Sequence, residues 1–179
     1  LQPFDMEKAI NEDADYVVFN GKVGAMTGED SLTAKVGETI RLYVGNGGPN
    51  LVSSFHVIGE IFDTVYMEGG NAKNHNVQTT LVPAGGSAIV EFKMDVPGNF
   101  IMVDHSIFRA FNKGALGMIK VDGADDKTIY SGKLSDNIYL PEGSAIQTVS
   151  DAVKPLTAQN KAERIRFGQR VYEANCQAC

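Results

Sequence analysis

The chain has 179 residues, of which 43% are hydrophobic and 21% are charged, and it carries a formal net charge of -6. This length allows one full hydrophobic core with an appendage, because domains commonly have about 100–150 residues. No stretch approaches the roughly 20 apolar residues that a membrane-spanning helix needs. The acidic balance argues against binding to nucleic-acid phosphates, which depends on Lys and Arg. We therefore expect neither a membrane span nor a nucleic-acid partner.

The amino-terminal part of the chain predicts a short helix followed by many short strands. The helix is expected before Tyr16, where apolar residues recur among acidic ones. From Tyr16 to about Asp122, apolar and polar residues alternate at the period of two that is typical of half-buried strands. The apolar positions of two such segments are Val36, Ile40, Leu42 and Val44, and then Ala88, Val90, Phe92 and Met94. With turns rich in Gly, Pro and Asn between the segments, this pattern predicts an antiparallel β-sandwich or barrel.

The sequence changes character after residue 122. Residues 123–159 have few apolar side chains among turn-forming and polar ones, which predicts a linker without a core of its own. A helix is expected to follow. Its signals are the capping pair Asn160 and Glu163 and the apolar stripe Phe167, Val171 and Ala174. The predicted organisation is a β domain over residues 1–122, the linker, and the start of a second domain over residues 160–179.

The chain has three histidines, His56, His75 and His105. Imidazole suits copper, zinc and iron, and a metal site that is open to substrate usually keeps three protein ligands and one free position. If His105 binds a metal, most of the other ligands must come from another domain or chain. The alternative for His105 is a partly buried histidine capped by Asp104 or by a backbone group.

His56 lies in a segment that predicts a strand with a histidine facing a pocket. Strand alternation puts His56 and Ile58 on one face and Phe55 and Val57 on the other. Histidine titrates near neutral pH and can donate a proton, and an aliphatic neighbour narrows a pocket and excludes water. The alternative is a histidine whose hydrogen bonds are satisfied inside the sandwich.

Three ordered blocks of sequence resemble a known family. They read Ser-Ser-Phe-His-Val-Ile-Gly-Glu-Ile-Phe-Asp at 53–63, Asn-Val-Gln-Thr-Thr-Leu-Val-Pro-Ala-Gly-Gly-Ser-Ala at 76–88, and Val-Asp-His-Ser-Ile-Phe-Arg-Ala-Phe-Asn-Lys-Gly-Ala-Leu-Gly at 103–117. Together they resemble the second cupredoxin domain of copper-containing, nitric-oxide-forming nitrite reductases. The resemblance implies that residues 1–122 form an all-β, Greek-key cupredoxin sandwich.

The resemblance also implies roles for individual residues. In that family each subunit has two cupredoxin domains, and the protein is a homotrimer. The first domain holds the type 1 electron-transfer copper. The type 2 catalytic copper lies between subunits, bound by two histidines of one first domain and one histidine of the neighbour's second domain. His105 matches that third ligand, His56 matches the histidine that delivers protons to nitrite, and Ile58 matches the residue that limits how nitrite sits on copper.

Three further residues are placed by the same comparison. Gln78 and Thr79 fall where the family has a polar pair near the proton-transfer histidine. Both are therefore expected to hold the site residues in place without contacting copper or nitrite themselves. Some members have a glutamate where this chain has Gln78, and a glutamine cannot ionise. His75 matches no catalytic position of the family, and we expect an exposed loop histidine.

Cys176 and Cys179 form a Cys-x-x-Cys pair at the end of the chain. Such a pair can be a redox disulfide, half of a zinc site, or the start of a Cys-x-x-Cys-His haem attachment sequence. Residues 167–176 resemble the first helix of a c-type cytochrome, and some copper nitrite reductases carry such a domain at their carboxyl end. This implies haem c on the two cysteines and a periplasmic location. The cytochrome domain is expected to be truncated, since no haem-binding histidine follows Cys179.

The resemblance predicts that the intact protein reduces nitrite to nitric oxide in denitrification, whereas this chain alone is inactive. Converting nitrite to nitric oxide and water takes one electron, two protons and a Lewis acid. Two alternatives stay open. One is a non-catalytic cupredoxin-like assembly module in which His56 and His105 are structural. The other is a multicopper oxidase that reduces oxygen, although the chain lacks the paired His-x-His motifs that such sites need.

Overall fold

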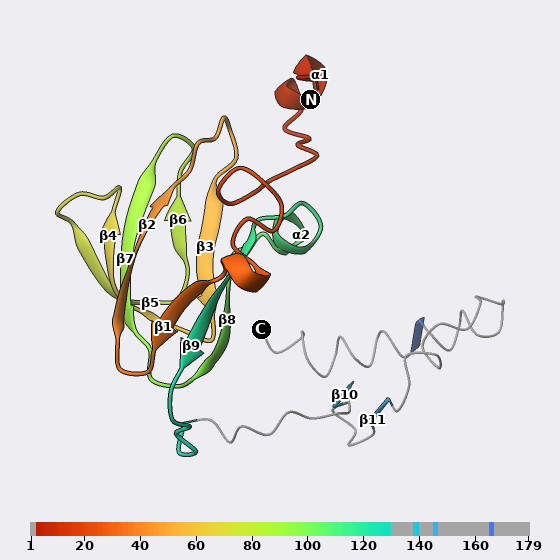
Figure 1. Ribbon diagram of the computed structural model, residues 1–179. Helices are drawn as coiled ribbons and strands as arrows, with labels where there is room; N and C mark the ends of the chain where they lie inside the picture. The colour runs from red at the N-terminus through yellow and green to blue at the C-terminus, as the bar shows by residue number, and fades with distance from the viewer. Residues whose placement is uncertain (1–2, 130–137, 140–144, 147–164, 167–179) are drawn as a thin grey trace. The chain divides into compact units, whose positions relative to one another are not determined.

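The chain divides into two compact units, Leu1–Ser131 and Gly132–Cys179. The computed structural model describes residues 3–129, 138–139, 145–146 and 165–166 (Figure 1). Within this described part, no helix is long and apolar enough to cross a bilayer.

The first unit contains two β-sheets. The five-stranded sheet has the order β1-β9-β8-β3-β6, and the four-stranded sheet has the order β2-β7-β4-β5 (Figure 1). The strands of the first sheet are β1 (Leu32–Lys35), β3 (Ser53–Ile58), β6 (Thr80–Val82), β8 (Gly98–Asp104) and β9 (Leu116–Asp122). Those of the second are β2 (Thr39–Gly45), β4 (Phe62–Met67), β5 (Lys73–Val77) and β7 (Ser87–Lys93).

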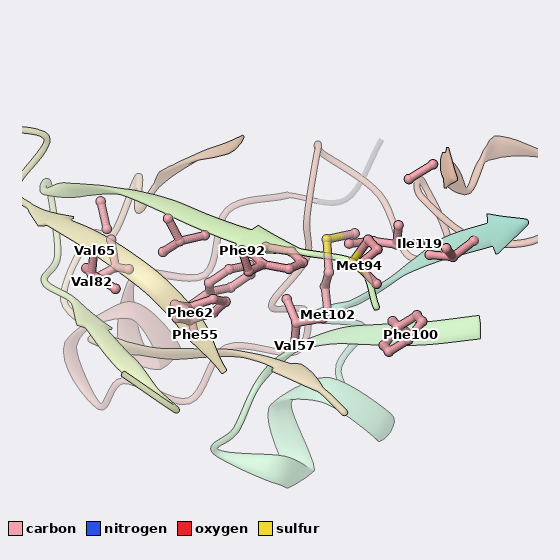
Figure 2. Packing of buried hydrophobic residues seen from close by; sticks show 14 residues of the cluster. Phe55, Val57, Phe62, Val65, Val82, Phe92, Met94, Phe100, Met102 and Ile119 are labelled. Carbon is pink, nitrogen blue, oxygen red and sulfur yellow. The ribbon is translucent and has the colours of Figure 1, made fainter. Parts of the chain in front are cut away.

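The hydrophobic core lies between the two sheets (Figure 2). Both sheets contribute fully buried side chains, such as Val57 and Ile119 from the five-stranded sheet and Val65 and Phe92 from the four-stranded sheet. Three aromatic rings join them: Phe55 stacks on Phe62 with centroids 5.9 Å apart, and Phe62 lies 5.6 Å from Phe92. The predicted all-β sandwich is therefore confirmed, including the alternation of half-buried and exposed residues along β2 and of buried and half-buried residues along β7.

Three predictions of local structure need correction. The sandwich is not purely antiparallel, because β1 pairs in parallel with β9, with Leu32 opposite Ile119. A parallel pair requires a long connection, which the intervening strands supply. Val36 lies in the turn before β2 and reaches the core from there. His75 is exposed, as expected, but it lies in β5 and not in a loop.

Two short α-helices and one 3-10 turn complete the first unit. They are α1 (Met6–Ile10), η1 (Gly28–Asp30) and α2 (Ile107–Phe111). The predicted amino-terminal helix is confirmed as α1, whose N-cap Asp5 accepts a hydrogen bond from the Lys8 amide at 3.0 Å. The sequence analysis did not predict α2, which directly follows the end of β8.

In the second unit, β10 (Ile138–Tyr139) pairs antiparallel with β11 (Ala145–Ile146), and residues 165 and 166 are helical. Residues 123–129 of the predicted linker are described as part of the first unit, and the rest of the predicted linker and carboxyl-terminal helix lies outside the described residues. Cys176 and Cys179 lie outside them as well.

The segment after α2 packs against the amino-terminal part of the chain at Gly114. The Val17 amide donates to the Lys113 carbonyl at 3.1 Å. Gly114 has φ +103°, and a Cβ added there would lie 2.7 Å from Cγ2 of Val23 and 3.2 Å from Cγ1 of Val18. Only a glycine allows both this backbone conformation and this close approach.

Replacing Gly114 with alanine should therefore destabilise the fold through strain and overlap together. We expect Gly114→Ala to lower the free energy of unfolding by about 3 kcal/mol, from backbone strain plus overpacking. Gly21→Ala is the matched control, because Gly21 has φ +84° but no atom within 4 Å of an added Cβ. The control should lose only about 1–2 kcal/mol. Urea denaturation measures both, and equal losses would show that the contact with Val18 and Val23 contributes nothing.

Candidate metal centre

His56 is a buried residue on β3, the strand next to the edge of the five-stranded sheet. Only 6% of its surface is exposed, and it pairs with Val103 of β8. On its other side β3 pairs with β6, where Phe55 lies opposite Thr80. The backbone at His56 is thus held by the pairing with β8, and the pairing with β6 ends one residue earlier, so its side chain has a fixed point of attachment.

The His56 ring is also fixed by a hydrogen bond. Its Nδ1 lies 2.5 Å from the backbone carbonyl oxygen of Gln78. A carbonyl can only accept, so Nδ1 carries the proton and donates it to this contact. Nε2 is then the nitrogen that can gain or lose a proton.

His105 lies one residue beyond the end of β8. Its amide donates to the Ser54 carbonyl at 2.7 Å, and its side chain is exposed. The rings of His56 and His105 are 5.6 Å apart between centroids, with an interplanar angle of 56°. The structure therefore brings the two histidines together, one buried and held and the other open to solvent.

The other predicted site residues are placed as follows. Ile58 lies on β3 on the same face as His56 by strand alternation and is 37% exposed. Gln78 and Thr79 follow β5 and are exposed, and Gln78 reaches His56 through its backbone carbonyl. His75 lies in the other sheet, where its Nδ1 contacts the Thr64 hydroxyl at 3.2 Å. His75 is thus not part of this site.

The donor set fits a metal that is shared with a second surface. Within residues 3–129 and the other described positions, no three His, Cys, Asp or Glu side chains come together as a complete metal site. None of the hydrogen bonds of that same part of the chain uses a ring nitrogen of His105. An exposed imidazole of this kind can serve as one copper ligand, while the remaining ligands come from elsewhere.

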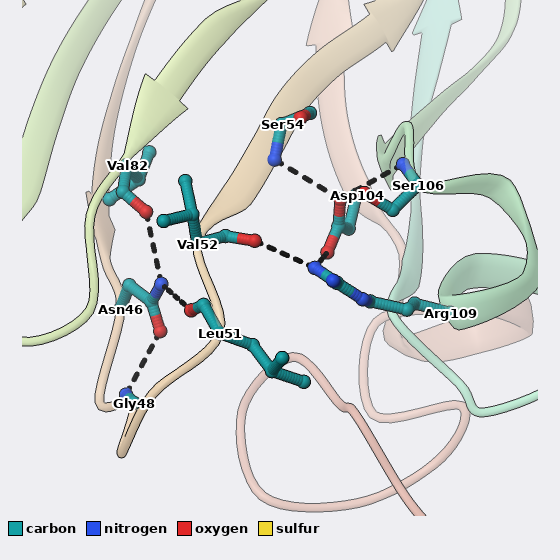
Figure 3. A network of polar contacts seen from close by, with 9 residues as sticks. All are labelled: Asn46, Gly48, Leu51, Val52, Ser54, Val82, Asp104, Ser106 and Arg109. Atoms are coloured by element: carbon teal, nitrogen blue, oxygen red, sulfur yellow. Dashed lines mark hydrogen bonds and ion pairs between the residues drawn. The ribbon is translucent and has the colours of Figure 1, made fainter. Parts of the chain in front are cut away.

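A buried carboxylate connects the strands that carry the two histidines (Figure 3). Asp104 is 2% exposed, and its Oδ1 accepts hydrogen bonds from the amides of Ser54 at 3.1 Å and Ser106 at 3.0 Å. Its Oδ2 lies 3.2 Å from Nη1 of Arg109, which also donates to the Val52 carbonyl at 2.7 Å. We call these five residues the Asp104 network.

The Asp104 network was not predicted from the sequence. Asp104 was expected only as a cap for the His105 side chain, whereas in the structure this carboxylate contacts backbone amides and Arg109. The available signal was the placement of two opposite charges, Asp104 and Arg109, five residues apart, with the first directly after the apolar run Phe100–Val103. A charge next to such a run is usually paired when it is buried.

An exposed apolar surface flanks the histidine pair. We call it the flanking apolar surface, and it consists of Ile58 on β3, Leu81 on β6, and Phe108 and Phe111 on α2. Leu81 lies opposite Ser54 in register, and α2 starts two residues after His105. Large exposed apolar groups gathered in this way are typical of interaction sites.

One carboxyl group near β3 titrates close to neutral pH. Glu60 lies in the turn after β3, and its pKa is raised to about 7, first by burial and then by the negative charges of Asp95 and Asp63. An experiment that measures the pH dependence of this site therefore needs a variant of Glu60 as a control.

Comparisons with known proteins identify the family of the chain. Residues 2–107 match the multicopper oxidase family. A copper-containing nitrite reductase of Neisseria meningitidis serogroup A is 69% identical over 145 residues, which are 81% of this chain and 38% of the relative. The structure of the copper nitrite reductase of Nitrosomonas europaea superposes with a TM-score of 0.63 at 34% identity, covering 70% of this chain and 46% of that one.

A second solved structure gives the same result. The copper-containing nitrite reductase of Thermus scotoductus superposes with a TM-score of 0.62 at 32% identity, over 67% of this chain and 28% of that chain. The chain spans 38% of the length of the Neisseria relative. From the family match and these relatives, we conclude that the chain belongs to the multicopper oxidase family and is related to its copper-containing nitrite reductases.

Proposed function

We propose that residues 1–122 of this chain are the second cupredoxin domain of a copper-dependent, nitric-oxide-forming nitrite reductase. The observation that supports this most strongly is the pair of histidines, in which a buried, hydrogen-bonded His56 lies 5.6 Å from the exposed ring of His105. His105 would be the ligand that this domain gives to type 2 copper. Copper bound there would supply a Lewis acid and the route by which an electron reaches nitrite.

His56 has the geometry of a proton donor. The reaction turns nitrite, one electron and two protons into nitric oxide and one water. Because Nδ1 of His56 is bonded to the Gln78 carbonyl, a proton delivered to the nitrite oxygen would leave from Nε2. Ile58, on the same face, would exclude water and restrict the orientation of nitrite. In this proposal Gln78 acts through its carbonyl, and Thr79 has a supporting role only.

The flanking apolar surface supports a homotrimer. Leu81, Phe108 and Phe111 are 68%, 76% and 59% exposed, and they lie on the elements next to the histidine pair. Covering them with a neighbouring subunit would remove apolar area from water and would bring that subunit's ligands to His105. The first cupredoxin domain, with its type 1 copper, would be part of the same protein.

The remaining parts of the proposal concern the carboxyl-terminal segment. Haem c bound to Cys176 and Cys179 would pass electrons to type 1 copper and then to the site of nitrite reduction. A protein that carries haem c in this way would be periplasmic and would serve denitrification. The support for these points is the sequence pattern of residues 160–179.

Removing the His105 imidazole should abolish copper binding at this site. In the intact protein, we expect His105→Ala to lose nearly all type 2 copper and nitrite reduction with it, because the shell lacks one of its ligands. His75→Ala is the matched control, since His75 is exposed in the other sheet, and it should change neither quantity. Metal analysis with electron paramagnetic resonance measures copper. Full turnover by a His105→Ala variant without type 2 copper would exclude the proposal.

Removing the proton donor should leave copper bound but slow the reaction. We expect His56→Gln to lower the turnover number by about 100-fold or more, with type 2 copper retained. Gln78→Ala should have little effect, because the backbone carbonyl that holds His56 remains. The dependence of turnover on pH should change in His56→Gln and stay unchanged in Glu60→Gln. A His56→Gln variant with normal turnover at every pH would contradict this role.

A further inference from the structure

The Asp104 network contains a buried charge that the proposed reaction does not use. We propose that Asp104, held by Arg109, is a positioning residue that sets the orientation of the His105 imidazole relative to His56. This inference rests on the proposed function and adds to it a determinant of metal binding that lies outside the ligand set.

One oxygen of Asp104 joins the two segments that carry the histidines. Its Oδ1 accepts from the amide of Ser54, at the start of the strand that contains His56. The same oxygen accepts from the amide of Ser106, the residue after His105. Since the amide of His105 itself donates to the Ser54 carbonyl at 2.7 Å, the backbone around His105 is fixed on both sides.

His105 lies just past the paired residues of β3 and β8. The pairing of β3 with β8 ends with Phe55 opposite Asp104, so His105 lies beyond the last paired residue. Its ring has no hydrogen bond to any part of the chain that the structure describes. The direction of the imidazole therefore depends on how the backbone is held at Ser54 and Ser106. Asp104 accepts one hydrogen bond from the amide of each of these residues.

Arg109 keeps the carboxylate in place. Its Nη1 bridges Oδ2 of Asp104 and the carbonyl of Val52, which ties α2 to the segment before β3 (Figure 3). The Asp104 side chain is 2% exposed and that of Arg109 is 28% exposed. Removing the guanidinium would leave a buried carboxylate without its partner, which is strongly unfavourable. Arg109 thus acts on His105 through Asp104.

The test compares three single variants of the intact protein and the double variant that combines Asp104→Asn with Arg109→Met. Asp104→Asn keeps the size of the side chain but removes the negative charge that pairs with Arg109. Arg109→Met removes the guanidinium and leaves the contacts of Oδ1. Arg41→Met is the matched control, because it breaks the ion pair of Arg41 with Glu91 on the four-stranded sheet, away from both histidines.

Two measurements separate positioning from general stability. Type 2 copper is removed selectively, and the affinity of that position for added copper is titrated while the visible absorption of the retained type 1 copper shows that the first domain stays intact. Hydrogen exchange at the amides of Ser54, His105 and Ser106 is measured in the protein that lacks type 2 copper, and other amides of the five-stranded sheet report general stability. Partners of metal ligands commonly change metal affinity by about 10–100-fold.

We expect Asp104→Asn to bind type 2 copper about tenfold more weakly, with faster exchange at the three amides and unchanged type 1 absorption. Arg109→Met should change the same quantities in the same direction, and the double variant should be no worse than Asp104→Asn alone, because the two residues act as a unit. Arg41→Met should match the wild type.

Other outcomes would overturn the inference. If Asp104→Asn and Arg109→Met bind copper as tightly as the wild type, Asp104 does not position His105, although the proposed function stands. If Arg41→Met weakens copper binding as much as Asp104→Asn and Arg109→Met do, the effect comes from general stability and Asp104 does not position His105. If the wild type takes up no copper at His105, the proposed function fails and the inference fails with it.

Discussion

The pairing of β3 with β8 is the constraint on which the candidate site depends. It puts His56 opposite Val103 and leaves His105 just past the last paired residue. One histidine is therefore inside the sheet and the other is at its open end, with rings 5.6 Å apart. The buried core behind β3, with Val57 fully covered and Phe55 stacked on Phe62, keeps this strand in register. The same packing that stabilises the sandwich thus sets the geometry of the site.

The His105 side chain is exposed to solvent, on the side where a neighbouring subunit would supply the remaining metal ligands in the proposed function. His105 offers one imidazole, and the exposed apolar side chains of the flanking apolar surface belong to β3, β6 and α2, the elements next to the histidine pair. In the proposed function, the described part of this domain supplies one ligand and not a complete metal shell, so metal binding would require an interface between subunits. This arrangement would make assembly and copper loading depend on each other, because ligands from both sides have to meet at one ion.

Much of the fold was predictable because strand alternation is a local property. Ala88, Val90 and Phe92 are buried as their spacing predicts, and the His56 face of β3 follows from the same rule. The role of Gln78 was not predictable from its side chain, since the contact uses its carbonyl. The Asp104 network depends on Ser54 and Val52, which are about 50 residues away in sequence, so only the folded chain brings it together. The parallel pairing of β1 with β9 was not predictable for the same reason, because the two strands are far apart in the sequence.

The most direct test of the account locates the metal itself. Anomalous scattering at the copper edge, measured on crystals of the intact protein, identifies each copper and its ligands without reference to activity. The account predicts a copper bound by the His105 imidazole of one subunit and by histidines of a neighbouring subunit, with the His56 ring nearby but not coordinated. A copper with all its ligands in one subunit, or no copper at His105, would contradict it.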